Sequence, residues 1–124
     1  MEPTIHKTIE LDNGYTLTIW DCSRNISTDA WLVRMKARME IEIVPELFSN
    51  PLPEGVTPAH IQEEMGGTAA YEYEVERNFI LNHEKEALFE SMVENFLDNL
   101  GHYVARPVFP QKYVVKSYLD RVQQ

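Results

Sequence analysis

The stretch A-W-L-V-R-M-K-A-R-M-E-I-E-I-V, from Ala30 to Val44, decides the fold that this sequence predicts. Apolar and charged residues alternate along it, and a period of two residues is typical of a β-strand with one buried face. The apolar row is Trp31, Val33, Met35, Ala37, Met39, Ile41 and Ile43, and the opposite row is Arg34, Lys36, Arg38, Glu40 and Glu42. We therefore predict a long strand with one face in the core.

A second alternating run extends from Ala69 to Phe79 and is interrupted at Arg77. Its apolar row holds Tyr71, Tyr73, Val75 and Phe79, and its polar row holds Glu72, Glu74 and Glu76. If this strand pairs antiparallel with the first, the glutamates lie beside Arg34, Lys36 and Arg38, where each opposite pair contributes about 0.2–1 kcal/mol. The complementary charges thus predict both the pairing and its register.

The N-terminal region reads as a β-hairpin. Thr4 to Leu11 and Tyr15 to Cys22 are the two strands, and Asp12-Asn13-Gly14 between them is a strong hairpin signal. In the first strand, Ile5, Ile9 and Leu11 are expected on one face.

Between the long strand and the glutamate strand, the chain is expected to leave the sheet. Residues 45–58 contain four prolines and Gly55, which do not suit a hydrogen-bonded ladder. Thr57-Pro58 then reads as the cap and first turn of a short helix, and Gly66-Gly67 ends it.

Two helices are predicted at the C-terminal end. Asn82 is expected to cap the first, an amphipathic helix that reaches Leu100 and stops at Gly101. The second begins near Pro110, which suits a first helical turn. Strands followed by helices favour the α+β class. We predict a single domain over residues 1–124, with a four-stranded, mainly antiparallel sheet and one face covered by the two C-terminal helices.

Composition narrows the classes of function. The 124 residues are 44% hydrophobic and 25% charged, as in ordinary globular domains. Eleven basic against 20 acidic residues give a net charge of −9, which opposes binding to nucleic-acid phosphates. Neither a membrane helix nor a signal-peptide pattern at Met1 to Lys7 is recognisable, and the single cysteine permits no internal disulfide. We expect a cytoplasmic protein that binds neither nucleic acid nor membranes.

The stretch W-D-C-S-R-N-I-S-T-D-A-W, Trp20 to Trp31, holds both tryptophans and the only cysteine. Cys22 beside Ser23 and Arg24 has the ingredients of an activated nucleophile. The interpretation we favour is a strand–loop–strand unit, because short polar residues hydrogen-bond their own turns and Cys22 can close a strand as a small apolar residue. This leaves Arg24, close to Trp20 in the sequence, without a structural role.

No catalytic residue, cofactor site or metal site is predicted. The histidines His6, His60, His83 and His102 are scattered, and His60 with Glu64 is the nearest approach to a metal-ligand spacing. A solvated helical turn explains that pair equally well. Phosphate-loop, dinucleotide-binding, nucleophile-elbow and calcium-loop motifs are missing from the sequence.

Two resemblances bear on the family. Asp21-Cys22-Ser23, with Arg34 four residues before Arg38, resembles the motifs of cyclic-di-GMP-binding PilZ domains, but the order is reversed, Ile26 takes the glycine position and both arginines lie in a strand. We therefore reject a PilZ domain. The runs W-L-V-R-M-K-A-R-M-E-I-E-I and Y-E-Y-E-V-E-R-N-F are similar to small uncharacterised bacterial proteins, a resemblance that implies no activity.

Three functions remain, in order of preference. The first is a non-catalytic interaction or regulatory module with a protein partner. The second is a small-molecule-binding domain or enzyme with a pocket between the sheet and the 45–67 excursion. The third is a homo-oligomeric structural protein that uses an exposed strand edge, so that both a monomer and a homodimer are open. The candidate ligand or interaction surface consists of Trp20, Arg24, Trp31, Arg34 and His60.

Overall fold

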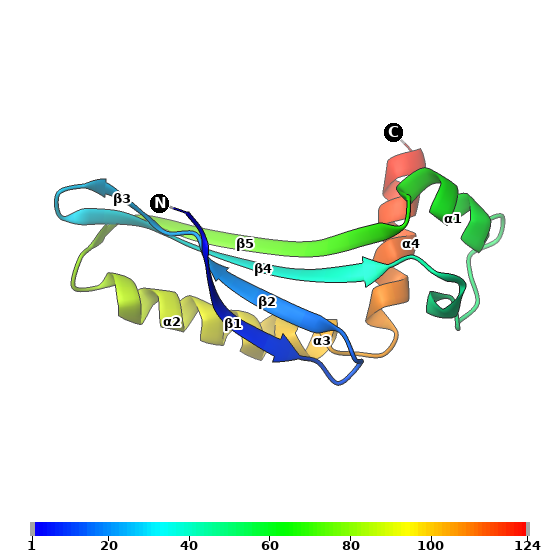
Figure 1. The fold of residues 1–124 in the computed structure, drawn as a ribbon, viewed down its shortest axis with the longest axis horizontal. Coiled ribbons are helices and arrows are strands. Elements are labelled where there is room, and N and C mark those ends of the chain that lie inside the picture. The colour runs from blue at the N-terminus through cyan, green and yellow to red at the C-terminus, as the bar shows by residue number, and fades with distance from the viewer. Residues whose placement is uncertain (1, 124) are drawn as a thin grey trace.

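The computed structural model describes residues 2–123 and confirms the α+β class (Figure 1). An antiparallel sheet forms one layer, and the helix α2 runs beneath it along one face. The strands are β1 (Thr4–Glu10), β2 (Thr16–Asp21), β3 (Arg24–Ser27), β4 (Ala30–Glu42) and β5 (Thr68–Leu81). The helices are α1 (Pro58–Met65), α2 (Lys85–Phe96), α3 (His102–Val104) and α4 (Phe109–Val122).

β4 is the strand that the rest of the sheet shares. One of its edges pairs with β2 and, further towards its start, with β3. Its other edge pairs with β5 along nearly its whole length, from Ala30 opposite Leu81 to Glu42 opposite Thr68. The order across the sheet is therefore β1, then β2 and β3 end to end, then β4, then β5.

The expected sheet of four strands is wrong by one strand, because residues 24–27 form β3 instead of a loop. These residues are mostly polar and show no alternating pattern. They become a strand because β4 extends beyond the end of β2, and the edge left free there accepts a partner, with Arg24 opposite Leu32. Tertiary pairing here overrides the local preference for a turn.

The predicted register of the two charged rows is confirmed. Lys36 Nζ lies 3.1 Å from a carboxylate oxygen of Glu72 and 3.8 Å from one of Glu74. Arg38 Nε lies 3.4 Å from Glu72, and Arg34 is paired with Glu74. The hydrogen bond from Lys36, followed by the charges of Lys36 and Arg38, holds the pKa of Glu72 below its ordinary value. The opposed pairs are Arg34 with Glu76, Lys36 with Glu74, and Arg38 with Glu72.

Reversing one charge in this ladder tests its contribution. We expect Lys36→Glu to lower the free energy of unfolding by about 1 kcal/mol at neutral pH, because the pairs are half-exposed and each contributes a fraction of that. Glu74→Lys alone also lowers stability, because it removes the pair with Arg34; in the double variant positions 36 and 74 attract each other again, so it should lose less than the sum of the two single losses. Urea unfolding of the single and double variants measures both effects.

The pH dependence of that loss follows from the lowered pKa of Glu72. A carboxyl group with a lowered folded-state pKa stabilises the fold above its unfolded pKa and loses that contribution as the pH falls through the folded value. The difference between wild type and Lys36→Glu should therefore shrink in acid. Lys112→Glu on α4 is the matched control, since Lys112 is exposed and away from the ladder and its substitution changes the net charge in the same direction. A double variant whose loss equals the sum of the two single losses would contradict the register.

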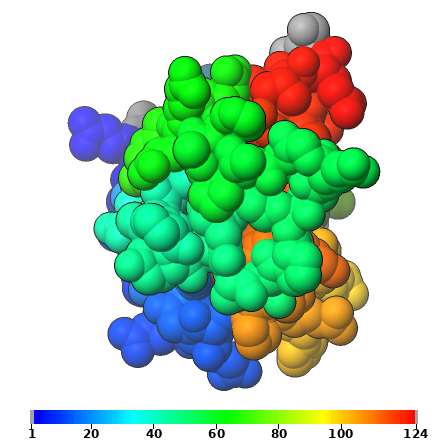
Figure 2. Space-filling view, turned by 90° about the vertical axis from the view of Figure 1, so that its right-hand side faces the viewer, coloured from blue at the N-terminus to red at the C-terminus, as the bar shows by residue number. Residues whose placement is uncertain are grey.

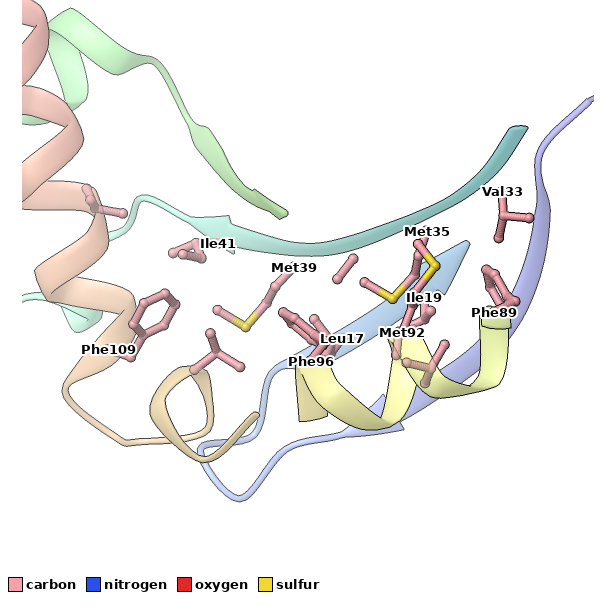
Figure 3. Close-up of a cluster of buried hydrophobic side chains, with 14 of the residues drawn as sticks. Leu17, Ile19, Val33, Met35, Met39, Ile41, Phe89, Met92, Phe96 and Phe109 are labelled. Carbon is pink, nitrogen blue, oxygen red and sulfur yellow. The ribbon is translucent and has the colours of Figure 1, made fainter. Parts of the chain in front are cut away.

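The core lies between α2 and the face of the sheet that carries the apolar row of β4. Figure 3 shows Phe89, Met92 and Phe96 of α2 opposite side chains of β2 and β4, and Phe109 opposite Ile41. The fully buried sheet residues on this face are Leu17, Ile19, Val33, Met35, Ala37, Met39 and Ile41, and Ile43, directly after β4, is almost fully buried as well. The alternation read from the sequence is thus the alternation between core and solvent.

Both predicted ends of the long helix are wrong. Asn82 does not cap α2; it lies in the turn before the helix, and its side-chain oxygen accepts a hydrogen bond from the indole N–H of Trp31. Gly101 does not stop the helix, because a π-helical turn, Leu97–Gly101, carries the chain on into α3. Gly101 keeps a helical φ of −56°, and continuing the helix buries Val104 completely.

The end of α3 is capped from far away in the sequence by the β1–β2 turn. Asn13 Nδ2 donates to the carbonyl oxygens of Val104 at 2.9 Å and Arg106 at 3.0 Å, and Asn13 Oδ1 accepts from the N–H of Tyr15 at 3.1 Å. One side chain therefore shapes the hairpin turn and satisfies carbonyl groups at the end of the helix.

Removing the Asn13 side chain should destabilise both the β1–β2 turn and the end of α3. We expect Asn13→Ala to lower the free energy of unfolding by about 1–3 kcal/mol, because polar groups in part-buried positions lose their hydrogen-bond partners. Urea unfolding followed by circular dichroism measures the change. Asp12→Asn, at the exposed neighbouring position, is the control and should stay within about 0.5 kcal/mol of wild type. Equal stability of the two variants would contradict this role.

The excursion after β4 folds over one end of the sheet. It begins with a 3₁₀ turn, Pro45–Leu47, and contains α1, whose Thr57 side chain accepts a hydrogen bond from the N–H of His60 as predicted. Figure 2 shows residues of this segment spread over that end. α4 stands across the same end of the sheet, beside α1 (Figure 1). Of the two C-terminal helices predicted to cover one face of the sheet, α2 does so, and this is not confirmed for α4. Within residues 2–123, no helix combines the length and the apolar character that crossing a bilayer requires.

Candidate functional site

The segment from Trp20 to Trp31 contributes side chains to both faces of the sheet. Asp21, Ser23 and Trp31 line a cleft of about 410 Å³ beside α2. Trp20 and Cys22 instead line a hollow of about 260 Å³ on the opposite, charged face, beside Lys36 and Arg38. The strand alternation explains this division, because neighbouring residues of a strand point to opposite faces.

The first of these hollows, which we call the Trp31 cleft, is assembled from four parts of the chain. The start of β1, the end of β2, the start of β4 and the first turns of α2 meet there (Figure 1). Its lining residues are Glu2, Thr4, His6, Asp21, Ser23, Trp31, Lys85, Glu86, Ala87, Phe89 and Glu90. Carboxylates thus outnumber cations around it.

Trp31 is held in this cleft by two contacts. Its indole N–H donates to Asn82 Oδ1 in the turn before α2. The ammonium of Lys85, in the first turn of α2, lies 3.7 Å from the centroid of the Trp31 ring. An ammonium over an indole face is attracted by the negative charge of the ring face. The cleft therefore already holds one cation on its aromatic wall.

His6 reaches the cleft because β1 is irregular. The register of β1 against β2 shifts between Ile5 and Lys7. His6 then packs edge-on against Phe89 with 4.8 Å between the ring centroids, and its Nε2 lies 3.3 Å from Glu90 Oε1. The same shift overturns the expectation that Ile5 shares a face with Ile9, since Ile5 pairs with Trp20 on the charged face and is 58% exposed.

Asp21 and Ser23 serve the backbone. Asp21 Oδ1 accepts a hydrogen bond of 2.9 Å from the N–H of Ser23, and Ser23 Oγ accepts one of 3.0 Å from the N–H of Arg34. Both bonds fix the connection between β2 and β3, which is the turn role expected for these short polar residues.

Cys22 is half-buried on the charged face. Burial raises the pKa of its thiol, and the opposing charges of Arg34 and Lys36 are the smaller influence. A raised pKa leaves less thiolate, the reactive form, at neutral pH. The geometry therefore supports the interpretation of Cys22 as the small residue at the end of a strand over that of an activated nucleophile.

Thiol labelling should reflect this environment. We expect Cys22 in the folded protein to react with iodoacetamide at least several-fold more slowly than free cysteine at pH 7.5, and to reach the free rate in urea. Mass spectrometry of timed samples measures both rates. Labelling of the folded protein faster than free cysteine would contradict the raised pKa.

The five predicted site residues do not meet. Trp20 and Arg34 lie on the charged face, Arg24 is exposed on β3, and Trp31 lies in the cleft on the α2 side. His60 is exposed on α1, at the other end of β4, whose 13 residues span roughly 40 Å. The expected pocket between the sheet and the excursion is also displaced: the hollow beside Asn50, Pro51 and Pro53, of about 650 Å³, has α4 as its other wall.

A second feature is the outer edge of β5, which we call the β5 edge. Within residues 2–123, no strand pairs with β5 on the side away from β4. Tyr113, from α4, donates its hydroxyl to the carbonyl of Ala70 at 2.8 Å and covers the first part of this edge. The remainder, from Tyr71 onward, carries the glutamate row on one face and the half-buried Tyr71, Tyr73 and Val75 on the other.

β5 also contains a bulge near its end. Val33 lies opposite Arg77 but Trp31 lies opposite Ile80, so β5 has one extra residue at this point. Phe79 within it has φ of 57°, a conformation that is strained for a bulky residue, and its side chain is 79% exposed. A large apolar side chain is thereby presented to solvent beside the edge, a combination that often marks a binding site.

Sequence reasoning missed His6, Lys85 and Glu90 in the cleft and Phe79 on β5. For the bulge of β5 a signal existed, since the alternation from Tyr71 to Phe79 breaks at Arg77. For His6 there was none, because the irregularity of β1 depends on its packing against α2.

Neither a search for metal-ligand clusters nor comparison with known proteins adds a residue to these two candidate sites. Among residues 2–123, no three His, Cys, Asp or Glu side chains gather in an arrangement that could hold a metal ion. Comparisons of the chain with protein-family models, with curated proteins and with solved structures found no match.

Proposed function

We propose that this protein is a non-catalytic interaction module that binds an extended, basic segment of a partner protein as an additional strand on the β5 edge. The observation that carries the proposal is the pairing of β4 with β5: it leaves a long strand whose outer edge combines free backbone groups with a row of carboxylates. Adding a peptide strand to an open sheet edge is a recurring mode of recognition.

The direction of the backbone groups follows from the hydrogen bonds of β4. Arg34 directs its N–H to Ser23 and its C=O to the N–H of Cys22, away from β5. The N–H and C=O groups of Met35 therefore face β5, and those of its partner Val75 face β4. By alternation, the N–H and C=O groups of Glu72, Glu74 and Glu76 point towards the open edge. An incoming strand would find three N–H donors and the carbonyl acceptors of Glu72 and Glu74 there, while the carbonyl of Glu76 already accepts a hydrogen bond of 2.9 Å from Arg77 Nη1.

Charge favours a basic occupant. A strand added beside β5 would place every second side chain next to Glu72, Glu74 and Glu76, and opposite charges there would be attracted. The net charge of −9 would also speed the encounter with a basic partner. The glutamate row would then lie between two rows of cations, one on β4 and one on the partner.

The other face of the edge favours apolar side chains. Tyr73 lies against Phe96 with ring centroids 5.0 Å apart, and Tyr71 lies against Phe109 at 5.3 Å. Both tyrosines and Val75 remain half-buried, although Tyr113 of α4 packs edge-on against Tyr71 with 5.5 Å between the ring centroids. The segment that fits best therefore alternates basic and apolar residues, and Phe79 offers an apolar contact beyond its end.

A second copy of the chain is the poorer occupant. Two β5 strands paired antiparallel about Glu74 would set glutamate opposite glutamate, and like charges opposite each other destabilise a sheet. This argues against the homo-oligomeric function. The single cysteine, which has no disulfide partner, suits an encounter in a reducing compartment such as the cytoplasm.

A peptide titration tests the proposal. The probe is a peptide of about nine residues that alternates Lys with Val, and the control replaces every Lys by Glu. We expect the Lys peptide alone to shift the amide resonances of residues 71–79 in ¹⁵N-labelled protein. Glu76→Lys should weaken binding by about three- to tenfold, as expected for reversing one charge pair. Glu76 forms no ion pair within residues 2–123, so the substitution removes no ion pair of the ladder. Because Glu76 lies opposite Arg34, a thermal melt checks that the variant is folded.

Backbone methylation makes the test specific for an added strand. If the added strand is antiparallel to β5, the residues that share a face with the glutamates form the hydrogen-bonded pairs, so N-methylation of the Lys residues should abolish binding while N-methylation of the Val residues is tolerated; a parallel strand would reverse this pattern. Glu63→Lys is the matched control for Glu76→Lys and should bind normally. Equal effects of both methylation patterns, or of both charge reversals, would show attraction to the acidic surface without an added strand and would overturn the proposal.

A further inference from the structure

We infer that the Trp31 cleft binds the ammonium group of a small amine on the face of Trp31, and that Lys85 of the protein itself occupies this place when no ligand is bound. The site lies beside β1 and α2, so it is separate from the β5 edge, and its function does not depend on the proposed partner segment.

The position of Lys85 is the first support. Its ammonium lies 3.7 Å from the centroid of the Trp31 ring, and within residues 2–123 it forms no ion pair with a carboxylate. Glu86 and Glu90 nevertheless stand on the same side of α2, four residues apart. The indole face is thus where this cleft holds a cation, which is the recognition chemistry of aromatic sites for alkylammonium ligands.

The rigidity of the indole is the second support. The hydrogen bond from Nε1 to Asn82 fixes the ring, and Trp31 also packs against the core. The indole ring therefore need not move when a cation binds, which lowers the free-energy cost of binding. The side chain of Lys85 is long and half-exposed, so it can swing away.

Charge and size define the ligand. Asp21, Glu86 and Glu90 surround the cleft with carboxylates, and Ala87 and Phe89 supply apolar wall. Its volume of about 410 Å³ lies at the lower end of the range for small-molecule sites. A compact amine with a short apolar body, such as a methylated ammonium compound, matches this lining better than an anion or a neutral polar molecule.

Fluorescence can follow Trp31 alone. Trp20→Phe removes the other tryptophan, which lies on the charged face, and leaves Trp31 as the only indole. Choline is the probe, and 3,3-dimethylbutanol is its neutral isostere. We expect choline to change the emission saturably and the neutral compound to leave it unchanged. In the same background, Glu90→Gln should weaken choline binding by about two- to fivefold, because one carboxylate of the rim is lost.

Lys85→Ala distinguishes a binding site from a structural contact. Removing the internal competitor should tighten choline binding by about two- to fivefold, since a cation on a half-exposed indole contributes little more than this. Lys112→Ala, an equal loss of charge at an exposed site on α4, is the matched control and should leave binding unchanged. Thermal melts confirm that each variant is folded.

Several results would overturn the inference. Equal binding of choline and its neutral isostere would show that the ammonium is not recognised. An unchanged or weakened affinity in Lys85→Ala would show that Lys85 does not occupy the ligand's place, and the absence of any saturable change in that variant would show that the cleft binds no amine of this class. Failure here leaves the peptide titration on the β5 edge unaffected.

Discussion

The antiparallel pairing of β4 with β5 is the constraint on which the other features of this fold depend. The two strands oppose each other from Ala30 and Leu81 to Glu42 and Thr68, and this register sets all three glutamates opposite cations. A slip by one residue would bring the apolar row of β5 to the charged face and its glutamates into the core, since side chains alternate with a period of two. Burial on one face and ion pairs on the other therefore select the same register.

Both candidate sites arise from this pairing. Because β4 is paired on both edges, β5 is left at the outside with its glutamate backbone groups facing solvent. The bulge of β5 opposite the start of β4 exposes Phe79, and the turn that follows β5 places Asn82 and Lys85 against Trp31. The domain thus has an open strand edge at β5 and, separately, a cleft lined by acidic side chains at Trp31.

Elements with a strong periodic signal could be predicted from the sequence. The long strand, its partner, their register, the hairpin about Asn13 and the α1 cap at Thr57 all follow from alternation, charge or turn chemistry. β3 could not, because its four residues become a strand only where β4 extends beyond β2. The continuation of the helix past Gly101 could not, because it depends on the burial of Val104 and on a cap from Asn13.

The candidate site was less predictable than the fold, for a related reason. Trp20 and Trp31 belong to one polar stretch, but strand alternation sends them to opposite faces, and His60 lies at the far end of β4. Proximity in sequence therefore indicated a site that the sheet divides. His6 from β1 and Lys85 from α2, which do line the Trp31 cleft together, share no local motif.

Hydrogen exchange of the backbone amides in β5 tests the open edge most directly. In the free protein we predict an alternation: slow exchange at Tyr71, Tyr73 and Val75, whose amides face β4, and fast exchange at Glu72, Glu74 and Glu76, whose amides face solvent. This pattern should persist over a wide range of protein concentration. Uniformly slow exchange through residues 71–76 would contradict the account, because it would show that another segment or another copy of the chain already covers the edge.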